Sequence, residues 1–375
     1  MVSHMVITDD PLEGQKVLDV HLLSQETLCR AIAYRCPLPT GGVGEISSSS
    51  DAGDEWLQPL LREARQRLLV EVGDADSKES AVPSRSEAKE LLHCIFSAEL
   101  PTRLLTCLHE IAFEARKEAM HLFAAITTAG CDADLGLEGK IVEYVVGAPH
   151  IAQMLVQGCG DKEVTMYCSD MLRNLLRHSS LVSFLLEELG AVDRLLEFAR
   201  SHDIEVSTEA FKTLRDLLLK HSQCTLKYLD NHYEGFFGQV HELLNEEYWV
   251  QRPALSFLRE VLSCNDFTDV QRRYTSNERF LQIHMNLLRD ESKYIQLDAF
   301  RIFKLFLANS GSLRVQQIIS RNRPKLIKLL ESLSVIDKDI EIVIDVLDGI
   351  PLPEATRRAN AKAAAATPKV AKVLA

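Results

Sequence analysis

The sequence predicts an all-α fold built from repeated helical units, and three observations support this prediction. Glycine and proline, which interrupt helices, number only 17 and 12 in 375 residues, below the roughly 7% and 5% that are usual. Apolar residues recur at helical spacing along most of the chain between residues 91 and 350. In addition, similar helical segments return at a nearly constant interval.

The repeating segments are DMLRNLLRHS (170–179), FKTLRDLLLKHS (211–222), ALSFLREVLSCN (254–265) and AFRIFKLFLANS (299–310). When their central cations Arg173, Arg215, Arg259 and Lys304 are aligned, the spacings are 42, 44 and 45 residues. This period is typical of armadillo and HEAT arrays. Because one such repeat cannot cover its own apolar face, we expect a right-handed armadillo/HEAT-like solenoid with a concave groove. The alternative, two separate helical bundles, would not require a constant period.

The N-terminal region, residues 1–90, is predicted to be helical but divergent. A helix over 18–34 is stopped by Pro37 and Pro39, and a second helix is expected over 55–72. Two polar stretches, about 40–54 and 74–85, contain too little apolar material to order themselves, so we expect disordered inserts there.

The repeat domain is predicted to cover residues 91–350. A fainter copy of the repeat lies at 114–126. Each of the four clear copies is followed by a further helical stretch, at 182–200, 226–244, 280–289 and 324–333. The last segment, 351–375, is rich in Ala, Pro and Lys and is expected to form a flexible basic tail.

The periodicity also predicts which side chains face the core. In the helix at 207–221 these are Ala210, Phe211, Leu214, Leu217 and Leu218, and in the next repeat Leu255, Leu258, Val261 and Leu262. Arg215 and Arg259 lie on the matching flank, so stacking would align them with Arg173 and Lys304 as a ladder. Two interpretations stay open, namely cations paired with nearby carboxylates and a binding stripe for an acidic or hydroxyl-rich segment.

A second group of candidates lies just before this ladder position. Pro253 predicts that a helix begins beside Arg252, because proline favours the first helical position. If the helix extends back to Tyr248, then Tyr248, Arg252 and Ser256 share one face through their four-residue spacing. An exposed Tyr beside an Arg is typical of interface hot spots. The alternative for Tyr248 is packing between repeats.

The charge distribution restricts the class of partner. The net charge of −12 disfavours a general nucleic-acid binder. Residues 271–328, however, hold twelve Lys/Arg and four Asp/Glu, a local +8 that favours a charge-complementary partner. An alternative function is therefore a generic protein-binding or RNA-binding helical module that uses this basic segment, although regularly placed stacking aromatics are missing from it.

Signatures of catalysis and of metal binding are absent from the sequence. It contains no phosphate-binding loop, zinc-protease or hydrolase motif, zinc-finger spacing or EF-hand loop, so we expect neither an enzyme nor a cofactor. The nine cysteines form no Cys-x-x-Cys pair, and no apolar run is long enough to cross a membrane. We therefore expect a cytoplasmic protein.

Several stretches resemble a known family. They are HYEGFF (232–237), NLLRDESKYIQLDAFRIFKLFLAN (286–309), KLIKLL (325–330), LRNLLRH (172–178) and AFKTLRDLLLKH (210–221). The chain is similar here to the calcium-binding protein 39 family, also called mouse protein 25, whose members are armadillo-like kinase scaffolds. The similarity runs from about residue 104 to 330, and no loop here suggests a calcium site.

The resemblance implies a non-enzymatic activator that holds a germinal-centre-type kinase or pseudokinase in its active arrangement on a concave face. The family's contacts fall on Tyr248 and Arg252, on Ile204, where an aromatic residue is usual, and on Ser256, where a lysine is usual.

The resemblance also implies a pocket at Phe267 and Met285 for a C-terminal Trp-Glu-Phe peptide. The arginine that neighbours this pocket in the family is not evident, the nearest residues being Cys264 and Asn265.

Overall fold

The structure, a computed structural model, describes residues 20–38, 56–69, 85–130, 139–309, 312–333 and 339–349. Helices are the only regular secondary structure of these described residues. The expected insert at 40–54, nearly all of that at 74–85 and the expected tail at 351–375 lie outside the described residues. The chain divides into two compact units, residues 1–228 and 229–375, and each is described by itself.

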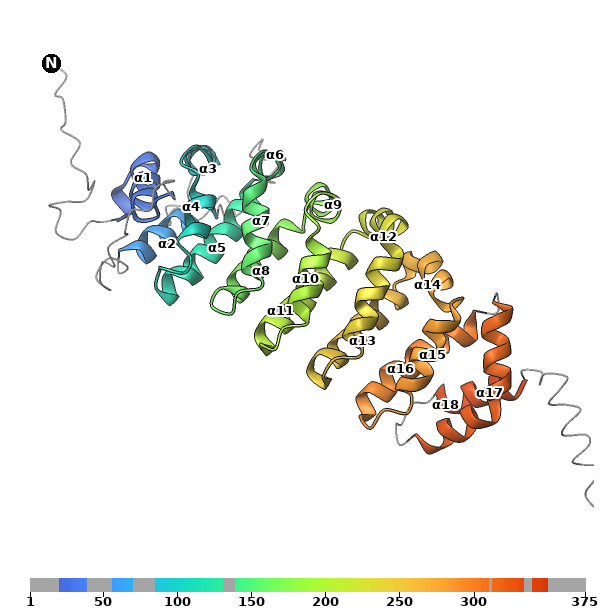
Figure 1. The fold of residues 1–375 in the computed structure, drawn as a ribbon. Coiled ribbons are helices and arrows are strands. Elements are labelled where there is room, and N and C mark those ends of the chain that lie inside the picture. The colour runs from blue at the N-terminus through green and yellow to red at the C-terminus, as the bar shows by residue number, and fades with distance from the viewer. Residues whose placement is uncertain are drawn as a thin grey trace, which may run out of the picture. The chain divides into compact units, whose positions relative to one another are not determined.

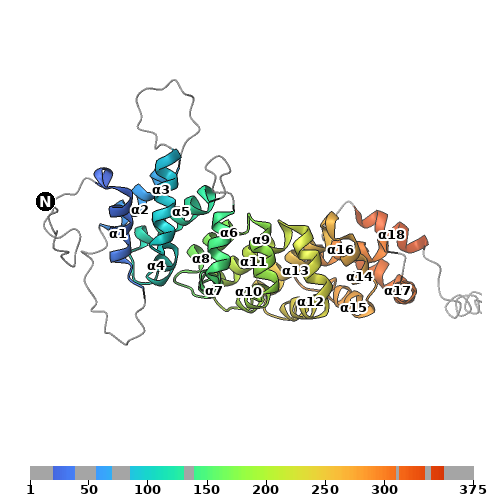
Figure 2. The same ribbon diagram turned by 90° about the horizontal axis from the view of Figure 1, so that it is seen from above.

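The N-terminal unit consists of successive helices that stack as repeats. They are η1 (Val20–Leu22), α1 (Gln25–Arg35), α2 (Leu57–Leu68), α3 (Arg85–Ser97), α4 (Leu100–Thr106), α5 (Phe113–Ala129), α6 (Lys140–Gly147), α7 (Pro149–Gly158), α8 (Thr165–Leu175), α9 (Ser179–Glu187), α10 (Ala191–Ala199) and α11 (Ile204–Leu219). Figure 1 shows α2, α5, α8 and α11 side by side, each in contact with the next. In Figure 2, α7 and α10 lie along one edge of the unit, in contact with each other.

Helix α11 illustrates how the sequence produces these elements. The Asp203 carboxylate accepts hydrogen bonds from the backbone N–H groups of Glu205 and Val206, at 2.9 and 3.2 Å, and so caps the first turn. All five residues expected in the core of this helix are buried. They pack against α8 and α10, so burial between neighbouring helices, rather than helix propensity alone, fixes α11.

One predicted helix is divided in two. The stretch 182–200 forms α9 and α10, which are separated at Gly190. Gly190 has φ +58°, a left-handed conformation that glycine adopts without the steric cost of a β-carbon. The apolar pattern continues through this break, which is why periodicity alone did not locate it.

The C-terminal unit continues the stacking of helices. Its elements are most of α12 (Ser222–Leu243), in which the division between the units falls, then α13 (Tyr248–Ser263), η3 (Asn265–Phe267), α14 (Thr268–Thr275), α15 (Glu278–Leu287), α16 (Lys293–Ala308), α17 (Leu313–Ser332) and α18 (Asp339–Gly349). Helix α13 packs on α16, and α17 packs on α15 and α18. The four core residues expected in α13 are all buried.

Two prolines do not start helices as the sequence predicted. Helix α13 begins at Tyr248, and Pro253 lies inside it; likewise Pro324 lies inside α17. The Glu247 carbonyl accepts hydrogen bonds from the N–H groups of Val250 and Gln251, both at 2.9 Å, which closes the first turn of α13 ahead of the proline. The expectation that Arg252 stands at a helix start is therefore wrong, and α13 extends back far enough for Tyr248 and Arg252 to share a face.

The core of the C-terminal unit contains a buried polar network. The Tyr274 hydroxyl lies 2.8 Å from His241 Nε2 and 2.8 Å from His284 Nε2. Phe237, Phe280 and Phe306 surround this trio at ring-centroid distances of 4.4 to 6.5 Å. Burial lowers the pKa of His241 to about 4 and that of His284 to about 3, the latter with a contribution from His241. Both rings are therefore neutral near pH 7.

Candidate partner-binding surface

The exposed face at the start of α13 brings together three of the residues that could contact a partner. Tyr248 is the first residue of the helix and is 45% exposed. Arg252, one turn later, is exposed and places its guanidinium carbon 4.2 Å from the centre of the Tyr294 ring. Tyr294 belongs to the neighbouring helix α16 and is 58% exposed. The cation–π contact therefore orders Arg252 across the junction of two helices.

Further along α13, Ser256 and Arg259 contact each other and acidic residues of the C-terminal unit. The Ser256 hydroxyl donates to Glu260 Oε1 at 3.3 Å and accepts from Arg259 Nη2 at 3.4 Å. Arg259 Nε lies 2.9 Å from Asp298 Oδ1, on α16. Both residues are half-buried, so Arg252 is the cation of α13 most accessible to a partner.

Three of the four ladder cations, Arg173, Arg259 and Lys304, each pair with a carboxylate on another helix. Arg173 Nη1 donates to Glu209 Oε2 at 2.7 Å and so joins α8 to α11. The ion pair of Arg259 with Asp298 joins α13 to α16, and Lys304 pairs with Asp339 and joins α16 to α18. Within each unit these contacts match the interpretation of the ladder as ion pairs.

The carboxylate at Glu209 is held in its charged form by its neighbours. Burial alone would raise the pKa of Glu209, but hydrogen bonds from Lys212 and Arg173 outweigh it, and the pKa lies below its ordinary value. The Lys212 ammonium donates to the second oxygen of this carboxylate at 2.7 Å. The pair of Arg173 with Glu209 is thus a structural contact, not an open binding site.

In the N-terminal unit, Ile204 and Arg215 both lie on α11. Ile204 is its first residue and is 67% exposed, whereas Arg215 is half-buried. Exposed apolar side chains also occupy the first or second position of α5 and α8, namely Phe113 and Met166. Together with Tyr248 on α13 and Tyr294 on α16, they form a set that we call the helix-start residues.

Sequence reasoning found two members of this set, Ile204 and Tyr248, but missed Phe113, Met166 and Tyr294. The repeat interval could have identified Tyr294, because it lies 46 residues after Tyr248, close to the repeat period. Each member is the first or second residue of its helix, and none of these five helices has an exposed large hydrophobic side chain beyond its first turn.

The proposed peptide pocket differs in accessibility between its two residues. Phe267, in η3, has no exposed surface, and Met285, in α15, is half-buried. At the place of the family's arginine, Cys264 is half-buried and Asn265 is exposed. Met285 is therefore the residue of this pair that a peptide would meet first.

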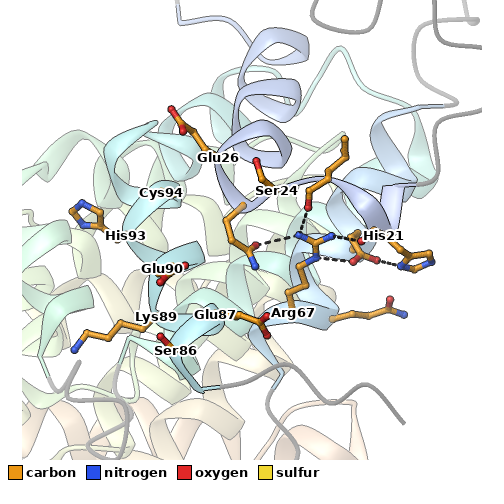
Figure 3. A pocket seen from close by; sticks show the side chains of 14 residues that line it. His21, Ser24, Glu26, Arg67, Ser86, Glu87, Lys89, Glu90, His93 and Cys94 are labelled. Carbon is orange, nitrogen blue, oxygen red and sulfur yellow. Dashed lines mark hydrogen bonds and ion pairs between the residues drawn. The ribbon is translucent and has the colours of Figure 1, made fainter. Parts of the chain in front are cut away.

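The N-terminal unit also contains a pocket of about 1250 Å³ between α1, α2 and α3. Figure 3 shows Arg67 at its wall, hydrogen-bonded to the segment that carries His21 and Ser24. Its guanidinium donates to the carbonyl of Leu23 at 2.7 Å and to Glu63 Oε1 at 2.7 Å. Arg67 is thus occupied in fastening the segment before α1 onto α2.

The structure adds two observations on metals and membranes. No group of three or more His, Cys, Asp or Glu side chains is arranged to hold a metal ion within the described ranges. In the same part of the chain, no helix combines the length and the apolar character that a membrane span requires.

Comparisons with known proteins agree with one another. A family model described as Mo25-like matches residues 48–343. MO25-like protein 2 of Caenorhabditis elegans is 32% identical over 283 residues, which cover 75% of this chain and 82% of that protein. The Calcium-binding protein 39-like protein of Mus musculus is 30% identical over 286 residues, which cover 76% and 81%.

A relative from another lineage, the degreening-related dee76 protein of Auxenochlorella protothecoides, is 32% identical over 76% of this chain and 86% of its own length. Among solved structures, a designed armadillo repeat protein in complex with a (KR)4 peptide shares 16% identity and covers 75% of this chain and 99% of its own. Its TM-score is 0.40, so the fold assignment rests on the helices themselves and on the sequence relatives.

Proposed function

Because the chain belongs to the Mo25-like family, we propose that it is a non-enzymatic scaffold that binds and allosterically activates a protein kinase or pseudokinase of the germinal-centre class. Within each unit, the contacts would lie on the first turns of the long repeat helices. Binding would stabilise the closed, active arrangement of the kinase, and the scaffold would supply no reacting group. A cytoplasmic location fits nine cysteines without disulfide-like spacing.

The observation that carries this proposal is the cluster of Tyr248, Arg252 and Tyr294. Tyrosine and arginine are the residue types most enriched among interface hot spots. The contact of Arg252 with the Tyr294 ring reduces the side-chain freedom that a partner would otherwise have to restrict on binding. The three side chains also combine apolar surface with hydrogen-bond donors, as an interface centre requires.

At two positions the residues of this chain are expected to bind a kinase more weakly than those of typical relatives. Ile204 offers less contact area than an aromatic ring, and Ser256 has no charge with which to pair an acidic group of the kinase. Ser256 is in addition engaged with Glu260 and Arg259. Replacing Ser256 by lysine or Ile204 by phenylalanine is therefore expected to strengthen the binding of a germinal-centre kinase.

The test compares Arg252→Ala with a matched control, Arg279→Ala. Arg279 is also an exposed arginine of the C-terminal unit, but it lies on α15, 31 residues after Tyr248 and 15 residues before Tyr294. With a panel of purified germinal-centre kinases, the wild-type protein should raise the rate of at least one member. Arg252→Ala should weaken that activation about tenfold, while the activation by Arg279→Ala and the melting temperatures of both variants stay unchanged. Equal activation by Arg252→Ala would contradict the proposed face, and no activation of any kinase would contradict the function.

A second part of the proposal is the pocket at Phe267 and Met285 for a C-terminal Trp-Glu-Phe-like peptide. A polarizable Met285 side chain adapts to an inserted aromatic ring. Phe267 would form the floor of the pocket only if the peptide displaced the side chains that cover it. A labelled peptide ending in Trp-Glu-Phe should bind wild type and lose binding to Met285→Glu; equal binding to both proteins would exclude this site.

A further inference from the structure

The C-terminal unit carries a row of cations on the outer face of α17 that the proposed function does not use. The row consists of Arg314, Arg321, Lys325 and Lys328. At 100° per residue these positions fall within an arc of about 60°, and at 1.5 Å per residue they span about 21 Å. The buried residues Val315, Ile319, Leu326 and Leu330 hold the helix in place from its other side.

Three of these cations have no carboxylate partner among the residues that the structure describes. Arg321, Lys325 and Lys328 are exposed and form no ion pair with any residue that the structure describes. Arg314 lies 3.4 Å from Glu278, and both side chains are exposed, so this contact is weak. The row therefore keeps nearly all of its charge available to a partner.

Carboxylates are nevertheless close by in the fold. Helix α18 packs on α17, and its Asp348 lies 3.6 Å from Arg323, while its Asp339 pairs with Lys304. Asp348 thus neutralises a cation on the flank of α17 and Asp339 a cation of α16, and neither forms an ion pair with the row. Like charges three and four residues apart destabilise a helix. The cations of the row therefore repel one another in the isolated protein, and a bound anion would reduce this repulsion.

We propose that this row binds an acidic helical segment of a protein partner. Arg314, Arg321 and Lys328 are seven residues apart, the interval at which charged residues flank the seam of two paired helices. Glutamates at the same interval on a helix that packs along α17 would each pair with one of these cations. Lys325, between Arg321 and Lys328, would add a further positive charge. The local charge of +8 over residues 271–328 complements such a segment and sets this surface apart in a chain of −12.

Other anionic partners fit the row less well. Helix α17 contains no aromatic residue on which the bases of single-stranded RNA could stack. A membrane-surface helix turns its apolar face towards lipid, whereas the apolar face of α17 is buried against protein. An acidic protein segment requires neither feature.

The test measures binding of a fluorescein-labelled, 18-residue helical peptide with glutamates every seven residues. The full chain is compared with the triple variant Arg321→Gln, Lys325→Gln, Lys328→Gln. A control triple variant, Lys117→Gln, Lys162→Gln, Arg279→Gln, removes the same charge from exposed lysines and an arginine elsewhere. We expect the first triple variant to bind about tenfold more weakly at 50 mM salt and the control to change less than about twofold.

Additional binding measurements distinguish an acidic helical partner from RNA, from membranes and from a general effect of net charge. A peptide with glutamine in place of glutamate should not bind, and Arg252→Ala should bind the acidic peptide as wild type does. Equal loss in both triple variants would show that net charge, not the row, is responsible. Tighter binding of a 20-nucleotide RNA, or of vesicles with one quarter phosphatidylserine, through these same residues would assign the row to that other partner and overturn the proposal.

Discussion

Glu209 shows how a single side chain joins two repeats. Its carboxylate is nearly buried and receives Arg173 from α8 and Lys212 from its own helix. We expect Glu209→Gln to lower the free energy of unfolding by about 1–3 kcal/mol, because a half-buried guanidinium loses its charged partner. Lys212→Gln is the control, since its ammonium is largely exposed, and should cost less than about 1 kcal/mol.

The pH dependence of this difference provides an internal check. Because the pKa of Glu209 is lower in the folded chain than its ordinary value of 4.5, its contribution is present above that pH. It is lost as the pH falls through the folded pKa. Urea unfolding at pH 7 and at progressively lower pH should show the gap between wild type and Glu209→Gln closing, and a gap that widens on acidification would contradict the assignment.

The network of His241, Tyr274 and His284 has a defined proton order. The Nδ1 atom of His284 is buried without a hydrogen-bond partner in the structure. An unpaired acceptor is tolerated more readily than an unpaired N–H, so the proton of His284 belongs on Nε2, which donates to the Tyr274 oxygen. The Tyr274 hydroxyl then donates to His241 Nε2, and His241 carries its proton on Nδ1.

Nitrogen-resolved NMR of the two rings tests this order and the titration. We expect ring pKa values of about 4 for His241 and about 3 for His284, because burial penalises the charged form. Since an unfolded histidine titrates near ~6.5, stability should fall as the pH drops from about 6.5 towards these values, by up to ~1.4 kcal/mol per pH unit for each ring. A ring that titrates near 6.5, or a proton found on Nδ1 of His284, would refute the network.

At the scale of single elements, Gly190 separates α9 from α10 through its left-handed backbone. A β-carbon at this position would meet no atom within 4 Å, so the cost of Gly190→Ala is purely conformational. We expect a loss of about 1 kcal/mol in the free energy of unfolding. Gly235→Ala, within the helix α12 and equally free of contacts, should instead stabilise by about 0.5–1 kcal/mol. Thermal or urea unfolding measures the change in the free energy of unfolding for both variants. Changes of the same sign and size would show that backbone conformation is not the cause.

The elements also show what the sequence could predict. The buried stripe of α11 was predicted because apolar spacing is a local property, and all of its residues lie in the core. The sequence left open whether α13 extends back to Tyr248, because a proline at an interior position resembles one at a helix start. The contact of Arg252 with Tyr294 joins residues 42 apart, and such a contact depends on the register between repeats, which local patterns do not define.

At the scale of the molecule, three of the long repeat helices, α8, α13 and α16, share one arrangement. Each exposes an apolar residue in its first turn, has buried side chains in its middle, and pairs its ladder cation with a carboxylate on another helix. The Arg252 cluster adds one arginine to this shared arrangement. The arrangement follows the repeat period and so can be inferred from the sequence, whereas the individual contacts depend on the register between helices.

Stability in such an array is expected to be a sum of local contributions, because each repeat contacts only its neighbours. Glu209→Gln acts on Arg173 and Lys212, whereas Tyr274→Phe acts on His241 and His284, and the two changes share no partner. The double variant should therefore lose the sum of the two single losses to within about 0.5 kcal/mol. The matched positive control is Arg173→Gln with Glu209→Gln, two residues in direct contact, whose losses should fall short of additive by at least about 0.5 kcal/mol. Urea unfolding of the full chain, followed by circular dichroism, measures the three single and two double variants. Strong coupling between Glu209 and Tyr274 would mean that the chain unfolds through contacts well beyond nearest neighbours, contrary to the repeat architecture.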